Sequence, residues 1–279
     1  MKRFCKIYVE ISNLCNLHCN FCPGTKRSPG RMNADDFTAL LPKLKPYTDF
    51  LYFHVMGEPL CHPQLEQLLA LAADAGFRVI LTTNGTLLPR MQDALLRAYS
   101  LHKVNISLHA FEANDLPMAF DEYLQGCCRF AAAAAGSKII TFRLWNHGGC
   151  DELNGKILDT LHQHFPGNWV TESRGTRIGD RIYLEFGEKF DWPDLGCSEM
   201  GNQVFCYGLR DQLGILCDGT VIPCCLDHEG DIALGNIFSS DLDAILNSPR
   251  AKAIYDGFSR GIATEELCRK CGYARRFQK

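Results

Sequence analysis

The sequence lacks a long apolar run, and no stretch approaches the roughly eighteen consecutive apolar residues that a membrane-spanning helix needs. It also lacks an apolar signal core, because the N-terminal residues 1–6 lead directly into a strand-like pattern. Low-complexity tracts and collagen-like periods are absent, and the formal net charge is only −3. We therefore expect a cytoplasmic protein for which neither a membrane nor a nucleic acid is an obligatory partner.

Cysteine, in contrast, is abundant. The 279 residues, 46% of them hydrophobic, suffice for one large domain and a small one, and they include 15 cysteines. In a secreted protein this number would suggest a disulfide framework, but no signal segment supports secretion. In a reducing cytoplasm, thiols that are committed to metal are the simpler explanation.

Three of these cysteines lie on one short segment, directly after the strand-like residues 7–11. Cys15, Cys19 and Cys22 can turn toward one centre on a compact loop, and soft sulfur ligands select zinc, copper(I) or iron-sulfur clusters. A structural zinc site closes with four protein ligands, whereas three ligands leave one metal position open. His18 could supply a fourth ligand, although its neighbours crowd it. The segment therefore predicts a metal site with an open position for a substrate or cofactor.

The spacing Cys15-x3-Cys19-x2-Cys22, with the aromatic Phe21 before the last cysteine, resembles the cluster loop of the radical S-adenosylmethionine (SAM) superfamily. The resemblance implies a 4Fe-4S cluster on the three cysteines, with SAM chelating the fourth iron. It also implies reductive cleavage of SAM to a 5'-deoxyadenosyl radical, which abstracts hydrogen from a substrate.

After this loop, strand-like and helix-like segments alternate. Asn33 can cap a first helix, which Pro46 ends. The further strands are expected at residues 50–55, 78–83, 104–108, 138–144 and 181–186, and the further helices at 63–75, 89–100, 121–135 and 152–165. Repeated strand-helix units imply an α/β fold with a parallel sheet, either open or closed into a barrel.

The positions of the polar motifs favour the barrel. The cysteine loop, Gly57-Glu58, Asn84, Ser107 and Arg143 each follow or end a strand, and barrel enzymes place their chemistry at that rim. Six units rather than eight predict a partial (β/α)6 TIM-like barrel that is open at its side, as in the radical SAM family.

Gly57-Glu58 resembles the family's Gly-Gly-Glu motif, which holds the amino group of SAM, although Met56 replaces its first glycine. A turn glycine followed by a solvated glutamate is the alternative. Asn84 and Ser107 suit the ribose of SAM, and Arg143 suits its carboxylate through a bidentate pair. Asn84 could instead belong to an Asn-Gly turn. Arg143 lies in an apolar strand, where an arginine usually has a buried anionic partner.

A second set of cysteines follows an expected domain boundary near Pro193, which divides the chain into residues 1–192 and 193–279. Cys206, Cys224, Cys268 and Cys271 can complete a coordination sphere, either for a closed iron-sulfur cluster or for a structural zinc ion. Their spacing, with Gly219 between the first two, resembles the SPASM or twitch extension of radical SAM enzymes. The resemblance implies one auxiliary 4Fe-4S cluster, and therefore two clusters in all.

Cys225 could replace Cys224 as a ligand, since only one of two consecutive side chains faces a given side, and we favour Cys224 from its spacing to Gly219. Cys197 and Cys217 are candidates for positions near the same cluster. The remaining thiols fit no ligand spacing and are expected to be inert: Cys5, Cys61, Cys127, Cys128 and Cys150. A β-hairpin is expected at residues 213–222, around the Asp218-Gly219 turn.

The two resemblances imply a radical SAM enzyme whose auxiliary cluster either accepts the electron left on a substrate radical, giving a net oxidation, or only holds the C-terminal extension together. The reductant would be a flavodoxin or ferredoxin, and the substrate a small cyclitol-like molecule or a peptide. Only fourteen residues precede Cys15, which favours a small molecule, or a peptide delivered by a separate carrier, over a peptide bound by an N-terminal recognition domain. The alternative is a non-catalytic iron-sulfur or zinc protein that relays electrons or serves as a scaffold.

Overall fold

The computed structural model describes residues 3–173 and 175–277, and the side chains within 3–173 and 175–274. Its centre is one continuous sheet with the strand order β11-β10-β9-β1-β2-β3-β4-β5-β8-β7-β6. The strands are β1 (Lys6–Val9), β2 (Phe50–Phe53), β3 (Arg78–Thr83), β4 (Leu101–Ser107), β5 (Ile139–His147), β6 (Val170–Glu172), β7 (Gly175–Gly179), β8 (Ile182–Glu188), β9 (Gln212–Ile215), β10 (Thr220–Ile222) and β11 (Gly235–Asn236).

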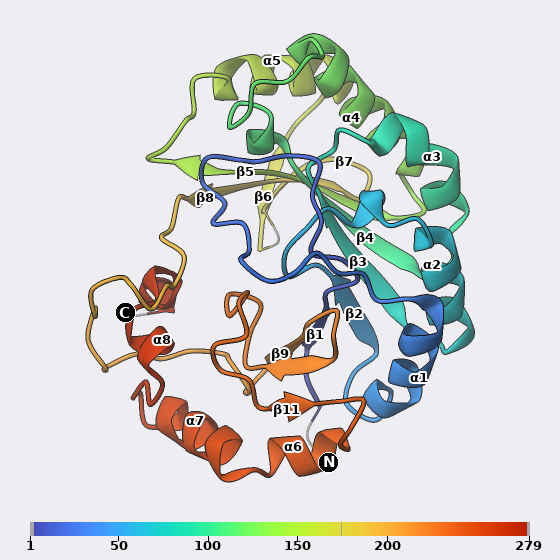
Figure 1. Ribbon diagram of the computed structural model, residues 1–279. Helices are drawn as coiled ribbons and strands as arrows, with labels where there is room; N and C mark the ends of the chain where they lie inside the picture. The colour runs from blue at the N-terminus through green and yellow to red at the C-terminus, as the bar shows by residue number, and fades with distance from the viewer. Residues whose placement is uncertain (1–2, 174, 278–279) are drawn as a thin grey trace.

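The helices alternate with the first strands along the chain. They are α1 (Ala34–Leu44), α2 (Leu65–Asp74), α3 (Leu88–Arg97), α4 (Phe120–Ala134), α5 (Asn154–His164), α6 (Leu242–Leu246), α7 (Pro249–Ser259) and α8 (Glu266–Arg269), with 3-10 turns η1 (Pro59–Cys61), η2 (Leu108–Ala110) and η3 (Gly272–Phe277). Helices α1 to α5 cover the outer face of the curved sheet (Figure 1). None of the described helices is both long and apolar enough to cross a membrane.

Six strands, β1 to β5 and β8, pair in parallel and form the predicted partial barrel. The sheet stays open, because β1 and β8 each pair outward with other strands, β9 and β7. Alternate residues face the helices, and these are buried apolar side chains such as Leu51, Val79 and Phe142. The alternate positions of β4 and β5 face the inside of the barrel and include the polar residues Asn105, Thr141 and Arg143. This part of the inner face is therefore polar.

The expected helices and strands are present, with ends that differ by a few residues. Asn33 caps α1, its side chain accepting a hydrogen bond from the Asp36 amide, but the helix ends at Leu44 and contains Pro42. The strand expected at residues 181–186 is β8. The sequence reading missed the hairpin β6-β7, which precedes β8 and pairs with it antiparallel.

The C-terminal part joins the same sheet. Strand β9 pairs in parallel with β1 and antiparallel with β10, which confirms the expected hairpin at Asp218-Gly219. Helices α6 to α8 lie beyond this hairpin (Figure 1). Because β9 extends the barrel sheet, the C-terminal segment is placed directly beside the strand that leads into the cysteine loop.

Candidate iron-sulfur and SAM site

The cysteine loop follows β1 and crosses the mouth of the curved sheet (Figure 1). The described cysteines include no disulfide, so all three thiols of this loop are free. Burial raises the pKa of Cys15 to about 11, with smaller contributions from the charges of Glu58, Cys19 and Cys22. Burial likewise raises the pKa of Cys19, to which the charge of Cys22 also contributes. The Cys22 amide donates to the Cys19 carbonyl at 2.9 Å, which keeps the cysteine loop compact.

Each thiol of the trio receives an N–H group. The Leu17 amide lies 3.4 Å from the Cys15 sulfur, and Asn84 Nδ2 approaches the same atom at 3.9 Å. Asn114 Nδ2 donates to Cys19 Sγ at 3.2 Å. A backbone hydrogen bond from Gly24 lowers the pKa of Cys22, against the raising effect of burial. Donors around sulfur stabilise the thiolate form, which is the form that binds iron.

The donor set fits an iron-sulfur cluster better than a single ion. In the part of the chain that the structure describes, no three His, Cys, Asp or Glu side chains lie close enough to bind one metal ion. A cluster binds each thiolate through a different iron atom, so its ligands stand further apart. His18 is exposed, and its amide donates to Asn114 Oδ1.

Gly57 and Glu58 form a turn that packs against the start of the cysteine loop. Gly57 has φ +78°, and a Cβ at this position would lie 2.4 Å from the Ser12 carbonyl oxygen, so only glycine fits. The Glu58 amide donates to the Leu14 carbonyl at 2.8 Å. The Gly57-Glu58 turn is therefore packed against the backbone that leads into Cys15.

The Glu58 carboxylate is 2% exposed and already has partners. It accepts hydrogen bonds from the Leu60 amide at 3.1 Å and from the Asn84 amide at 2.7 Å. Burial raises its pKa to about 7, although these bonds and one from Thr83 lower it. Glu58 thus ties the turn after β2 to the turn after β3. Its contact with the SAM amino group remains a prediction.

Three further residues predicted to contact SAM lie at the ends of neighbouring strands or within them: Asn84 follows β3, Ser107 ends β4 and Arg143 lies in β5. Ser107 and Arg143 are register partners on β4 and β5. Arg143 Nε lies 3.3 Å from Glu185 Oε2, which provides the anionic partner, and its guanidinium stacks 4.6 Å from the Trp145 ring. Because Glu185 already pairs with Arg143, the predicted contact with the SAM carboxylate would have to share or displace that pair.

Phe21 lies with its ring 5.0 Å from the ring of His109. His109 follows β4 in η2, and its Nδ1 is 3.0 Å from the Arg143 carbonyl oxygen. The aromatic residue of the cysteine motif is therefore in contact with the same rim as Ser107 and Arg143.

Sequence reasoning missed two groups of residues at this site. Asn114 lies in an irregular segment after η2 and has no motif that would identify it. Glu10 is fully buried and forms two bonds with Arg27, at 2.6 and 2.9 Å, and it also accepts from the Met56 and Cys217 amides. A glutamate in the apolar segment before Cys15 was the available signal, since buried carboxylates require a partner.

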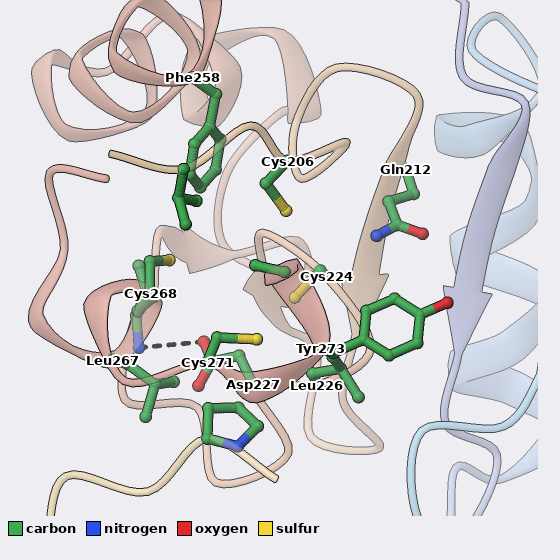
Figure 2. A pocket seen from close by; sticks show the side chains of 14 residues that line it. Cys206, Gln212, Cys224, Leu226, Asp227, Phe258, Leu267, Cys268, Cys271 and Tyr273 are labelled. Atoms are coloured by element: carbon green, nitrogen blue, oxygen red, sulfur yellow. Dashed lines mark hydrogen bonds between the residues drawn. The ribbon is translucent and has the colours of Figure 1, made fainter. Parts of the chain in front are cut away.

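The second cysteine set lines a cavity between β9, the segment after β10 and the C-terminal helices. Figure 2 shows the sulfur atoms of Cys206, Cys224, Cys268 and Cys271 pointing into one space. Burial raises the pKa of Cys206 to about 11 and is the largest cause of the raised pKa values of the other three. Four soft donors around one small cavity fit a closed iron-sulfur cluster.

The neighbouring cysteines do not line this cavity. Cys225 hydrogen-bonds to the Tyr8 side chain and packs against a buried cluster that contains Tyr8 and Met56. Cys217 lies on the barrel side, in contact with Gly30 and Glu10, and Cys197 is exposed. The structure therefore directs Cys224, rather than Cys225, toward the predicted cluster.

Comparisons with known proteins define the class. Residues 9–129 match the radical SAM superfamily model, and residues 206–272 match SPASM, an iron-sulfur cluster-binding domain. These matches contain the two predicted cysteine sets. The chain carries a radical SAM domain and a C-terminal SPASM domain.

Among curated relatives, the S-adenosyl-L-methionine-dependent 2-deoxy-scyllo-inosamine dehydrogenase of Niallia circulans is 25% identical, over 97% of this chain and 93% of that protein. An AdoMet-dependent heme synthase of Methanosarcina barkeri is 29% identical over 42% of this chain. The match spans only 36% of that heme synthase.

Solved structures share the fold. BtrN in complex with AdoMet and 2-DOIA aligns with a TM-score of 0.57 and 18% identity, covering 97% of this chain and 94% of that one. Streptococcus suis SuiB aligns with a TM-score of 0.66 and 15% identity, covering 99% of this chain and 74% of that one.

Proposed function

We propose that this protein is a SAM-dependent dehydrogenase that oxidises a polar, hydroxylated small molecule such as an aminocyclitol. The observation that carries the proposal is the placement of Cys15, Cys19 and Cys22 as free thiols on one short loop after β1, within the segment that matches the radical SAM model. These three cysteines would hold a 4Fe-4S cluster, which would supply an open iron for SAM and the electron for its cleavage.

The residues around the trio would hold SAM and exclude water. Gly57 and Glu58 fix the loop, while Asn84, Ser107 and Arg143 present amide, hydroxyl and guanidinium groups at the rim. Abstraction of a hydrogen atom removes one electron and one proton from the substrate. Loss of a second electron, to a cluster that Cys206, Cys224, Cys268 and Cys271 would hold, and of a second proton, to solvent, would complete the oxidation.

The polar inner face supports a polar substrate. Tyr52 and His54 lie with their rings 6.2 Å apart on and just after β2. Lys103 and Arg143 both pair with Glu185, at 3.7 and 3.3 Å. These groups present hydrogen-bond donors and acceptors that can bind the hydroxyl and amino groups of a substrate.

The full-length match to the 2-deoxy-scyllo-inosamine dehydrogenase supports the same class of substrate. A peptide is the second candidate, because SuiB bound to its precursor peptide SuiA has a TM-score of 0.60 with this chain. We further propose a flavodoxin or ferredoxin as the reductant and a reducing cytoplasm as the location, in agreement with the free thiols.

Incubation without oxygen tests the reaction. The reconstituted protein is mixed with SAM, dithionite and either 2-deoxy-scyllo-inosamine or a peptide that contains cysteine and serine, with a Cys19→Ala variant as control. The proposal predicts 5'-deoxyadenosine together with a cyclitol product that is lighter by two hydrogens, and neither from the variant. Modification of the peptide with no change in the cyclitol would support the second candidate instead.

A further inference from the structure

Asn114 has a fixed position beside the cysteine loop. Its Oδ1 accepts the His18 amide at 2.9 Å, and its Nδ2 donates to the Ala110 carbonyl at 2.7 Å and to Cys19 Sγ at 3.2 Å. The His18 amide can only donate, so it fixes the orientation of the Asn114 side chain. Nδ2 therefore has to face the sulfur atom.

A second contact strengthens this attachment. The Asn20 amide donates to the Ala113 carbonyl at 3.2 Å, so the segment after η2 contacts the cysteine loop through both backbone and side chain. By comparison, Asn84 Nδ2 is 3.9 Å from Cys15 Sγ and also donates to Asn16 Oδ1 at 2.9 Å. Among the described side chains, Asn114 thus makes the shorter of the two amide contacts with the trio.

Hydrogen bonds to the sulfur ligands of an iron-sulfur cluster are one of the factors that set its reduction potential. Reduction adds negative charge to the cluster and its thiolates, so an N–H donor stabilises the reduced form more than the oxidised form. Removal of the donor should therefore lower the potential and make reduction harder.

We propose that Asn114 is a positioning residue that raises the reduction potential of the cluster held by Cys15, Cys19 and Cys22. This inference rests on the proposed function, because it needs a cluster at that site. Asn114 acts through Cys19 and touches neither SAM nor the substrate in this assignment. The segment after β4, which lies on the same rim as Ser107, thereby controls how easily the cluster accepts an electron.

The test is an anaerobic redox titration followed by electron paramagnetic resonance. The signal that changes when SAM is added identifies the open-iron cluster. Asn114→Leu removes the donor without adding charge, and Asn114→Asp keeps the acceptor for the His18 amide but removes the donor. Asn20→Asp is the matched control, because it adds the same charge to the loop, and Asn20 Nδ2 donates to Cys150 rather than to the trio.

We expect both Asn114 variants to contain about tenfold less reduced cluster relative to oxidised cluster at a fixed potential, equal to a shift of about 59 mV for one electron. Asn20→Asp should shift the potential less than Asn114→Asp does. A wild-type potential in Asn114→Leu, or equal shifts in the two aspartate variants, would overturn the inference.

Loss of iron from both Asn114 variants, with full loading of the control, would also overturn it, since the amide would then only build the loop. The proposed function fails in a different way. If the wild-type protein shows no signal that responds to SAM, the cluster assignment itself is wrong, whatever the variants do.

Discussion

Gly57 is the residue on which the geometry of the cysteine loop depends most directly. We expect Gly57→Ala to destabilise the protein by several kcal/mol, because a positive φ costs about 1–2 kcal/mol for a residue with a Cβ and the Ser12 carbonyl occupies the space. Thermal unfolding and iron content measure the effect. Gly24→Ala is the control, since Gly24 also has a positive φ but no atom within 4 Å of its added Cβ. Equal losses in the two variants would contradict the steric explanation.

Cys224 and Cys225 differ in direction although they are adjacent. Cys224 lines the four-cysteine cavity, whereas Cys225 contacts Tyr8. We expect Cys224→Ser to reduce the iron content from about eight to about four atoms per chain, and Cys225→Ser to leave it unchanged. Iron analysis after anaerobic reconstitution distinguishes them. The opposite pattern would make Cys225 the ligand.

Residues with chemical motifs could be found from the sequence, and residues without them could not. The spacing of the two cysteine sets contained the information needed to propose both sites, because ligand spacing on a loop constrains geometry directly. Asn114 could not be found, since its role depends on how an irregular segment after η2 folds against a loop 95 residues away.

At the scale of elements, the ion pair between Glu10 and Arg27 joins β1 to the segment that follows the cysteine loop. Arg27 Nε also donates to the His228 carbonyl at 2.8 Å, so the pair reaches the C-terminal part. We expect Arg27→Met to cost about 3–5 kcal/mol of unfolding free energy, because it leaves the fully buried Glu10 carboxylate without a countercharge.

Denaturant unfolding measures this cost, with Arg97→Met as the control. Arg97 pairs with Glu66 at 3.8 Å, but both side chains are largely exposed, so its loss should cost only about 0–1 kcal/mol. A loss of that small size in Arg27→Met would show that Glu10 is stabilised by the backbone amides alone.

The alternation of strands and helices was predictable because the helix-facing positions are apolar at regular spacing. The hairpin β6-β7 was missed, since its two strands are short and β6 is exposed throughout, which leaves no pattern of burial to read. The parallel pairing of β9 with β1 was also beyond the sequence, because no local signal specifies which strand an edge will meet.

For the molecule as a whole, buried histidines predict sensitivity to acid. His62 is 3% exposed, with Nδ1 facing the Gln64 amide and Nε2 facing the Met32 carbonyl, and burial lowers its pKa. The unfolded chain takes up this proton near pH 6.5, whereas the folded chain resists it. Stability is therefore present above pH 6.5 and is lost as the pH falls toward the folded-state pKa, by up to about 1.4 kcal/mol per pH unit for one site.

Glu58 changes the stability in the opposite direction. Its pKa is raised to about 7 in the folded protein, so its contribution to stability is lost as the pH rises through that value. The effect of His62 is therefore separated from that of Glu58 by comparing the unfolding free energies of the wild type and a His62 variant at two pH values. We expect His62→Asn to be less stable than the wild type at pH 7.5 and to lose less further stability by pH 5.5, in denaturant titrations at both values. Parallel losses in the two proteins would show that His62 does not contribute to the acid sensitivity.

The open-iron cluster on Cys15, Cys19 and Cys22 is tested most directly by the formation of 5'-deoxyadenosine from SAM and dithionite in the anaerobically reconstituted protein, measured together with its metal content. We expect about eight irons per chain and cleavage of SAM, whereas a Cys15→Ala/Cys19→Ala/Cys22→Ala variant should keep about four irons and form no 5'-deoxyadenosine. Zinc in place of iron, or intact SAM with a fully loaded wild-type protein, would contradict this expectation.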